Sequence, residues 1–186
     1  MRRSLLASGR SHFLEGVAMI AEFLVLLVLP ALLAAAAGWD LASFTIPNFV
    51  PLALIAGFVA FVVVAGMTPG AVGFHVLAGF VGLAIGFTLF ALGYVGGGDA
   101  KLFAVVVLWL GFGDLPNFAL LAAILGGALA LALMGLRTLP LPAVLVGQSW
   151  IRRLHDTGSG IPYGVALAAG ALLVLPHTEV FRLAVG

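Results

Sequence analysis

Six apolar segments, nearly free of charged side chains, are the feature that most limits how this chain of 186 residues can fold. A helix needs about 20 mainly apolar residues to cross a hydrocarbon core about 30 Å thick. The segments that reach or approach this length are residues 17–38, 49–67, 74–95, 100–112, 118–136 and 162–175. The fourth and sixth are short and are bounded by Gly or Pro. We therefore expect an all-α, polytopic membrane protein whose six helices form one transmembrane bundle.

The composition excludes several other classes of protein. Hydrophobic residues make up 63% of the chain and charged residues only 8%, whereas an average soluble domain carries about 25% charged residues. A soluble globular enzyme and a disordered chain are both excluded. The formal net charge of +1 provides no basic surface for nucleic acid, and the absence of cysteine excludes disulfides and thiolate metal sites. We expect no cofactor and no metal ion, because His75, His155 and His177 are scattered in the predicted topology.

The predicted spans also set the domain organisation. We expect residues 1–16 to form an N-terminal extension and residues 17–186 to form a single membrane domain. Six crossings place both termini on one face of the membrane and the loops at 39–48, 96–99 and 137–161 on the other. The Lys and Arg residues divide four against four between the two faces, so the positive-inside rule does not orient the chain.

Small residues at helical spacing give the third span a face for close packing. They are Gly82 and Gly86, in a Gly-x-x-x-Gly pattern. Whether this face meets the chain's own bundle or a second copy is left open by the pattern.

Two of the seven acidic residues lie on the same predicted face of the membrane, each beside a turn. Asp40 ends the first helix and Asp99 begins the fourth. Each has a structural explanation, Asp99 as the N-cap that follows a glycine turn and Asp40 as the polar end of a helix. Acids near hydrocarbon are costly, however, and therefore mark functional sites. Two of them on one face fit an aspartyl dyad, in which neighbouring carboxyls share a proton; one then activates water and the other hydrogen-bonds the substrate carbonyl.

The residues beside these acids have conformational roles of their own. Before Asp99, three glycines lack side chains, so that a helix or an extended substrate can approach the backbone closely. They are Gly96, Gly97 and Gly98. After Asp40, Pro47 ends the connection, and we expect Asn48 to cap the second helix through its side-chain oxygen.

At these residues the sequence resembles the type IV prepilin peptidases, a family of GxGD aspartic proteases. The G-x-G-D motif of the family, usually continued by x-K-L, is present as Gly96-Gly97-Gly98-Asp99-Ala100-Lys101-Leu102. The first catalytic aspartate of the family precedes Ile-Pro-Asn, as Asp40 here precedes Ile46-Pro47-Asn48, and its last span often opens with Pro-Tyr-Gly, here Pro162-Tyr163-Gly164. The three motifs occur in the order of the family, and the resemblance covers nearly the whole chain.

The resemblance implies the roles of the site residues. Asp40 and Asp99 are the implied catalytic pair, which hydrolyses the bond after a leader peptide without a cofactor. The residues implied to shape the substrate site are Gly96, Gly97, Gly98, Lys101, Pro47, Asn48, Pro162 and Tyr163. Four roles are open for Lys101. It pairs with an acidic group of the substrate, pairs with a lipid phosphate, favours the ionised form of Asp99, or simply extends its charged end to the membrane interface.

The resemblance also implies a substrate and a location. The chain lacks the cysteine-bearing N-terminal region of bifunctional members, and so looks like the short Tad or Cpa type associated with Flp pili. Such a protein cleaves Flp-type prepilins and pseudopilins, without methylating them, at the cytoplasmic face of the bacterial inner membrane. With the Asp40 and Asp99 face in the cytoplasm, Arg2, Arg3 and Arg10 lie on the opposite side of the membrane, which departs from the family pattern. Either the extension is an interfacial amphipathic segment or the start codon is misassigned.

Two other functions are compatible with the same residues. A small proton-coupled transporter would use Asp40 and Asp99 as a proton relay within apolar spans. A non-catalytic membrane factor of pilus assembly would require neither aspartate. Transporters built on inverted repeats need matching broken helices in two halves, and the sequence has no convincing pair.

Overall fold

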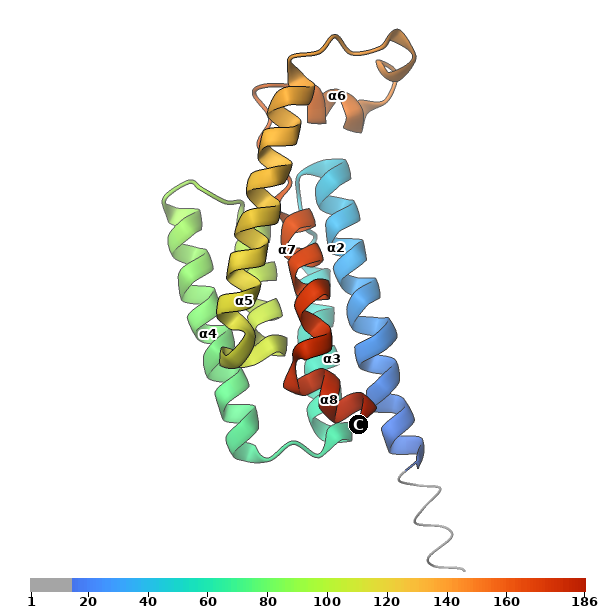
Figure 1. Ribbon diagram of the computed structural model, residues 1–186, viewed down its shortest axis with the longest axis vertical. Coiled ribbons are helices and arrows are strands. Elements are labelled where there is room, and N and C mark those ends of the chain that lie inside the picture. The colour runs from blue at the N-terminus through green and yellow to red at the C-terminus, as the bar shows by residue number, and fades with distance from the viewer. Residues whose placement is uncertain (1–14) are drawn as a thin grey trace, which may run out of the picture.

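The structure, a computed structural model, describes residues 15–186 as a bundle of helices (Figure 1). Arg2, Arg3 and Arg10 lie outside the described residues. The elements after the first helical turns are η1 (Leu24–Val28), α2 (Leu29–Ser43), α3 (Phe49–Ala65), α4 (Pro69–Ala91), α5 (Gly97–Arg137), η2 (Ala143–Leu145), α6 (Ser149–His155), α7 (Tyr163–Val174), η3 (Leu175–His177) and α8 (Glu179–Val185). The described part of the chain contains no strand, which confirms the expected all-α fold.

Three helices are long and apolar enough to cross a membrane, namely Glu15–Ser43, Pro69–Ala91 and Gly97–Arg137. A fourth crossing results if Tyr163–His177 and Glu179–Val185, which meet at a bend of 57°, are taken as one broken span. By helix length and composition, the described residues therefore contain three or four candidate spans and not the expected six. The physical reasons are that α3 has only 17 residues and that the fourth and fifth predicted spans are joined within α5.

Helix α5 reverses direction at Gly111, where φ is 74° and ψ is −177°. In one straight helix, Phe103 and Phe118 would lie about 22 Å apart along the axis, yet their rings stack with centroids 5.3 Å apart. The element is thus a hairpin with a first arm (residues 97–110) and a second arm (residues 112–137), and Figure 1 shows the turn between them. Glycine tolerates this left-handed φ, which other residues rarely adopt.

His75 of α4 supports the break in α5. Its side chain is only 4% exposed, and Nδ1 lies 2.8 Å from the carbonyl oxygen of Leu108. This carbonyl stands just before Gly111, where the helical hydrogen-bond pattern is interrupted, and a buried carbonyl without a partner would be costly. His75 is therefore explained by a structural role.

Helix α4 packs tightly against the first arm of α5 through three glycines. A Cβ at Gly79 would lie 3.1 Å from Leu108 Cβ, and one at Gly82 would lie 2.9 Å from Val107 Cβ. At Gly86 it would lie 2.8 Å from the carbonyl oxygen of Ala100. The small-residue face predicted at Gly82 and Gly86 therefore meets the chain's own bundle.

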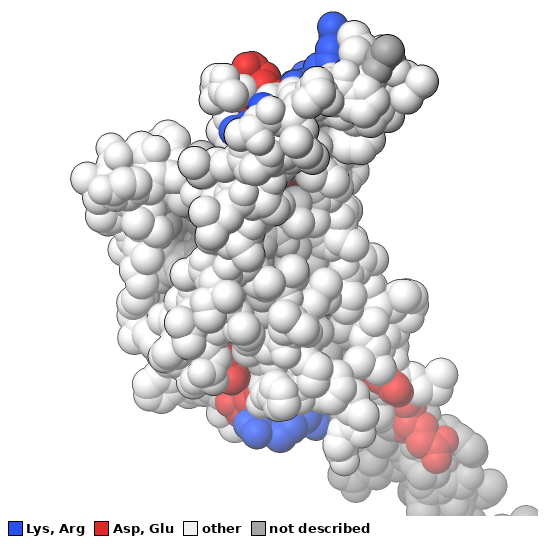
Figure 2. Space-filling model, turned by 45° about the horizontal axis from the view of Figure 1, so that its top comes forward, with Lys and Arg blue, Asp and Glu red and all other residues white. Residues whose placement is uncertain are grey.

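Charged residues gather at the two ends of the bundle, and Figure 2 shows a broad surface between them without Lys, Arg, Asp or Glu. At one end, Arg137 donates from Nε to the carbonyl of Leu154 and from a terminal nitrogen to that of Gly160, which holds α6 over the end of α5. At the other end, Asp114 lies near Arg182 and His177. An uncharged belt of this kind is what a bilayer requires.

Candidate active site

Two buried acids from different helices meet at the start of α7. Asp40, in the last turn of α2, is 3% exposed, and its Oδ2 accepts a hydrogen bond of 2.6 Å from the backbone N–H of Gly164. Asp99, in the first turn of α5, is 7% exposed and lies near the same N–H. The two carboxyl groups are close enough to interact electrostatically. Residues far apart in the sequence thus form one cluster around a single backbone amide.

Asp99 is not the N-cap of its helix. The cap is Gly96, and Asp99 is the third helical residue, whose Oδ2 accepts the Gly96 N–H at 3.1 Å. This contact satisfies one of the amides that a helix N-terminus leaves without an intrahelical partner. The other carboxyl oxygen, Oδ1, is buried and has no hydrogen-bond partner within the described chain. An unpaired buried polar atom is costly to keep, and this oxygen of Asp99 keeps its capacity to accept a hydrogen bond.

Gly164 is a further residue of the site, beyond those predicted from the sequence. A Cβ at this position would lie 2.8 Å from Asp40 Oδ2 and 2.8 Å from Ile46 Cδ1. Any larger residue would therefore displace the carboxyl group or the loop. The signal was present in the sequence as the glycine that follows Pro162 and Tyr163 at the start of the last span.

Pro162 and Tyr163 immediately precede Gly164 at the start of α7. Pro162 is fully buried and is the N-cap residue of α7. The ring of Tyr163 lies against Gly126 of the second arm of α5, where an added Cβ would come within 3.3 Å of the ring. Tyr163 and Asp99 both line a cavity of about 250 Å³ between α4, α5 and α7.

The loop after Asp40 is folded onto the acids. Helix α2 ends because Phe44 adopts a left-handed conformation, with φ of 56°, and donates its N–H to the Asp40 carbonyl at 2.7 Å. This conformation costs about 1 kcal/mol or more for a residue with a Cβ. It directs the chain so that Ile46 is buried between Gly98 and Gly164.

At the three glycines before Asp99, other parts of this chain lie close to the backbone. A Cβ at Gly98 would lie 3.1 Å from Ile46 Cβ, and one at Gly97 would lie 3.5 Å from the ring of Phe90. A Cβ at Gly96 would lie 3.1 Å from Asp99 Oδ2. The close approach expected at these glycines is therefore made by the loop, by α4 and by the acid.

Asn48 and Lys101 pair with each other. Lys101 Nζ donates a hydrogen bond of 2.8 Å to Asn48 Oδ1. The expected capping role of Asn48 is wrong, since its side chain makes no cap hydrogen bond and its backbone is already helical. Caps normally have extended backbone, from which the side chain reaches the free amides. Pro47 shapes this turn through its carbonyl, which accepts the N–H of Val50 at 3.0 Å.

The site thus contains two acids held by backbone amides in an environment that excludes most water. One carboxyl keeps an oxygen that has no hydrogen-bond partner among residues 15–186. Paired carboxyls of this kind can divide the roles of base and acid between them. Within the described residues no group of three His, Cys, Asp or Glu could hold a metal ion.

Comparison with known proteins identifies a family. The sequence model of the type IV leader peptidase family matches residues 27–131, which include Asp40, the loop after it, and the glycine motif with Asp99. No curated protein and no solved structure matches the chain.

Proposed function

Because the chain belongs to the type IV leader peptidase family, we propose that it is an aspartic endopeptidase in which Asp40 and Asp99 cleave the leader from a prepilin. The observation that carries this proposal is the convergence of both carboxyl groups on the N–H of Gly164. Two buried acids placed so close together gain little stability from each other. Their arrangement suits hydrolysis, because one can be neutral while the other is ionised.

In the proposed reaction, the ionised carboxyl takes a proton from water, and the oxygen attacks the carbonyl carbon of the scissile bond. The neutral carboxyl donates a hydrogen bond to the carbonyl oxygen, where negative charge develops. The C–N bond then breaks, and the leaving amine takes a proton from the dyad. Gly164 N–H holds Asp40 in position through these steps, and the products are the free leader and the mature chain.

We place the acids at the cytoplasmic face of the bacterial inner membrane, in a bundle that crosses it six times. The two arms of α5 supply two of these crossings and α3 another, since its 17 residues are apolar. Asp40, Asp99 and α6 then share one face. The resemblance to the Flp-associated type favours Flp-type prepilins and pseudopilins as substrates, without methylation of the product.

The test is cleavage of a Flp-type prepilin co-expressed with variants of this protein. Asp40→Asn and Asp99→Asn keep the size of each side chain but remove its ability to accept a proton. We expect both to abolish leader removal while the protein accumulates at its normal level in the membrane.

Asp114→Asn is the matched control, because Asp114 lies at the opposite end of the bundle near Arg182. We expect it to cleave at the wild-type rate. Normal leader removal by either dyad variant would refute the proposed function.

A further inference from the structure

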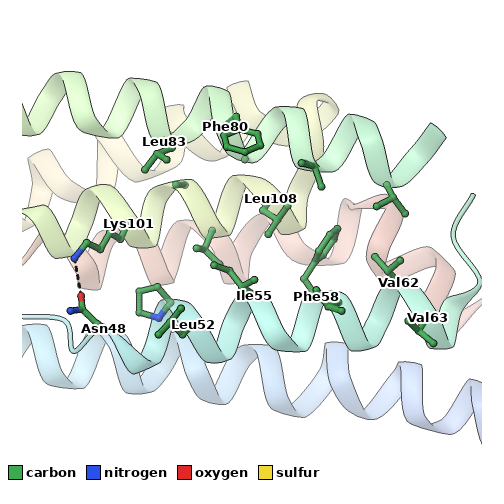
Figure 3. A pocket seen from close by; sticks show the side chains of 17 residues that line it. Asn48, Leu52, Ile55, Phe58, Val62, Val63, Phe80, Leu83, Lys101 and Leu108 are labelled. Carbon is green, nitrogen blue, oxygen red and sulfur yellow. Dashed lines mark hydrogen bonds between the residues drawn. The ribbon is translucent and has the colours of Figure 1, made fainter. Parts of the chain in front are cut away.

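Helices α3 and α4 both pack on the first arm of α5, but they diverge and leave a groove between them (Figure 3). Its volume is about 780 Å³. The walls come from α3 and α4, with residues such as Leu52, Val59 and Leu83, and the floor from α5, with Leu108. Every lining residue is apolar or glycine except for two, which are Asn48 and Lys101.

The length of the groove fits a helix. Along α3 it runs from Asn48 to Val63, which corresponds to about 22 Å of helix, or roughly four turns. An apolar helix that lies in such a groove buries one face against side chains of matching chemistry, a common mode of peptide recognition.

The polar end of the groove adjoins the proposed active site. Lys101 follows Asp99 by two residues, and Asn48 follows Ile46, which packs against Gly98 and Gly164. Positions 99 and 101 lie on different faces of the helix, so a chain leaving the groove has to cross the start of α5 to reach the acids. Gly96 at that start is exposed and has no side chain, so an extended segment can pass over its backbone.

The position of the acids sets the direction of the occupant, and Lys101 sets the charge that this direction requires. A helix presents its positive end at its N-terminus, and Lys101 adds a like charge at the same place, so an occupant that lies this way needs a negative group in its first turn. Lys101 is held across the mouth of the groove by its 2.8 Å hydrogen bond to Asn48 Oδ1, which Figure 3 shows. A carboxylate in the first turn of the occupant would replace Asn48 as the acceptor and would also compensate the helix end.

From this geometry we infer that the groove between α3 and α4 binds the apolar helix of the substrate, with its N-terminal end and an acidic side chain at Lys101. This inference rests on the proposed function. The helix enters the groove from the bilayer, and the extended residues that precede it cross the start of α5 to the dyad. The groove thereby positions the scissile bond at Asp40 and Asp99.

The first test compares two substrates. One is a full prepilin, and the other is a short peptide that spans the cleavage junction but lacks the apolar helix. Val59→Trp fills the groove from α3. We expect it to reduce kcat/KM for the prepilin, relative to the peptide, by about tenfold or more, as overfilling of a packed contact should. Leu131→Trp, on an exposed part of α5 away from the groove, is the matched control and should leave that ratio unchanged.

The second test uses crosslinking and does not depend on activity. A photoreactive phenylalanine derivative at Val63, which is 76% exposed in the groove, should form an adduct with the apolar helix of the prepilin in native membranes. The same group at Leu131 should not. Adducts with lipid alone at Val63, while prepilin is still cleaved, would overturn the inference, as would an unchanged substrate ratio in Val59→Trp.

Charge reversal tests the polar end. Lys101→Glu should reduce cleavage of a prepilin with an acidic first turn, and a substrate in which that acid is replaced by Lys should restore it. Equal loss with both substrates would contradict the pairing. Failure of the proposed function is distinguishable, because it would appear as cleavage by the Asp40→Asn or Asp99→Asn variant, whatever the groove variants do.

Discussion

The tight contact between Gly164 and Asp40 leads to a quantitative prediction for Gly164→Ala. The added Cβ would lie 2.8 Å from Asp40 Oδ2, 2.8 Å from Ile46 Cδ1 and 3.0 Å from Asp40 Cβ, whereas ordinary contacts of a Cβ begin at 3.4 Å. The carboxyl group or the start of α7 must therefore move by about 0.6 Å, the difference between 3.4 and 2.8 Å. The alanine keeps its N–H, so the change displaces the acid without removing its donor.

The size of the effect follows from how strictly catalysis depends on position. A displacement of about 1 Å can reduce a rate about a hundredfold. We expect Gly164→Ala to lower kcat for prepilin cleavage by about ten- to a hundredfold and to change KM much less. Overpacking should also reduce the free energy of unfolding by about 1–3 kcal/mol.

The assay measures kcat and KM with purified protein and a prepilin substrate, together with the thermal unfolding midpoint in detergent. Gly127→Ala is the matched control, because a Cβ there meets nothing within 4 Å. It should keep the wild-type kcat. A wild-type kcat for Gly164→Ala would refute the reasoning that this glycine sets the position of Asp40.

Two further predictions concern the packing that supports the site. Gly111→Ala places a Cβ on a residue with φ of 74° and within 3.2 Å of the His75 ring, so it should lower the free energy of unfolding by about 1–3 kcal/mol, measured as a lower thermal midpoint. The control Gly113→Ala, where a Cβ meets nothing within 4 Å, should keep the wild-type midpoint. Equal midpoints for the two variants would contradict the account of the break. Trp109→Phe removes the buried hydrogen bond of 2.9 Å from Nε1 to the Leu54 carbonyl and should cost about 1 kcal/mol in the same measurement, whereas a variant as stable as the wild type would show that this bond contributes nothing.

Several features of the chain were predictable from its sequence for local reasons. Apolar runs of helical length predict the all-α membrane fold, because backbone amides in a bilayer must be paired within the helix itself. The motif around Asp99 predicts the family, which the match over residues 27–131 confirms. The scarcity of acids makes Asp40 and Asp99 the predicted pair, and the structure brings these two residues to one place.

Other features depend on distant residues and were missed. Asn48 is a residue type that often caps helices, but its side-chain oxygen accepts a hydrogen bond from Lys101, 53 positions later, instead. The six predicted spans appear as fewer long helices, since the arms of α5 are joined at Gly111 and supported there by His75. Neither contact leaves a pattern in the surrounding sequence.

The sequence by itself determined which segments are helical and apolar, and which few acids lie at their ends, because hydrophobicity and turn chemistry are properties of neighbouring residues. Only the tertiary structure decided that Gly164 donates to Asp40, that the face of Gly82 and Gly86 packs on α5, and that α3 and α4 diverge to form a groove. The physical reason is that these features are contacts between helices. Such contacts depend on close packing and on the direction in which each helix crosses the bundle, and local sequence preferences do not specify either.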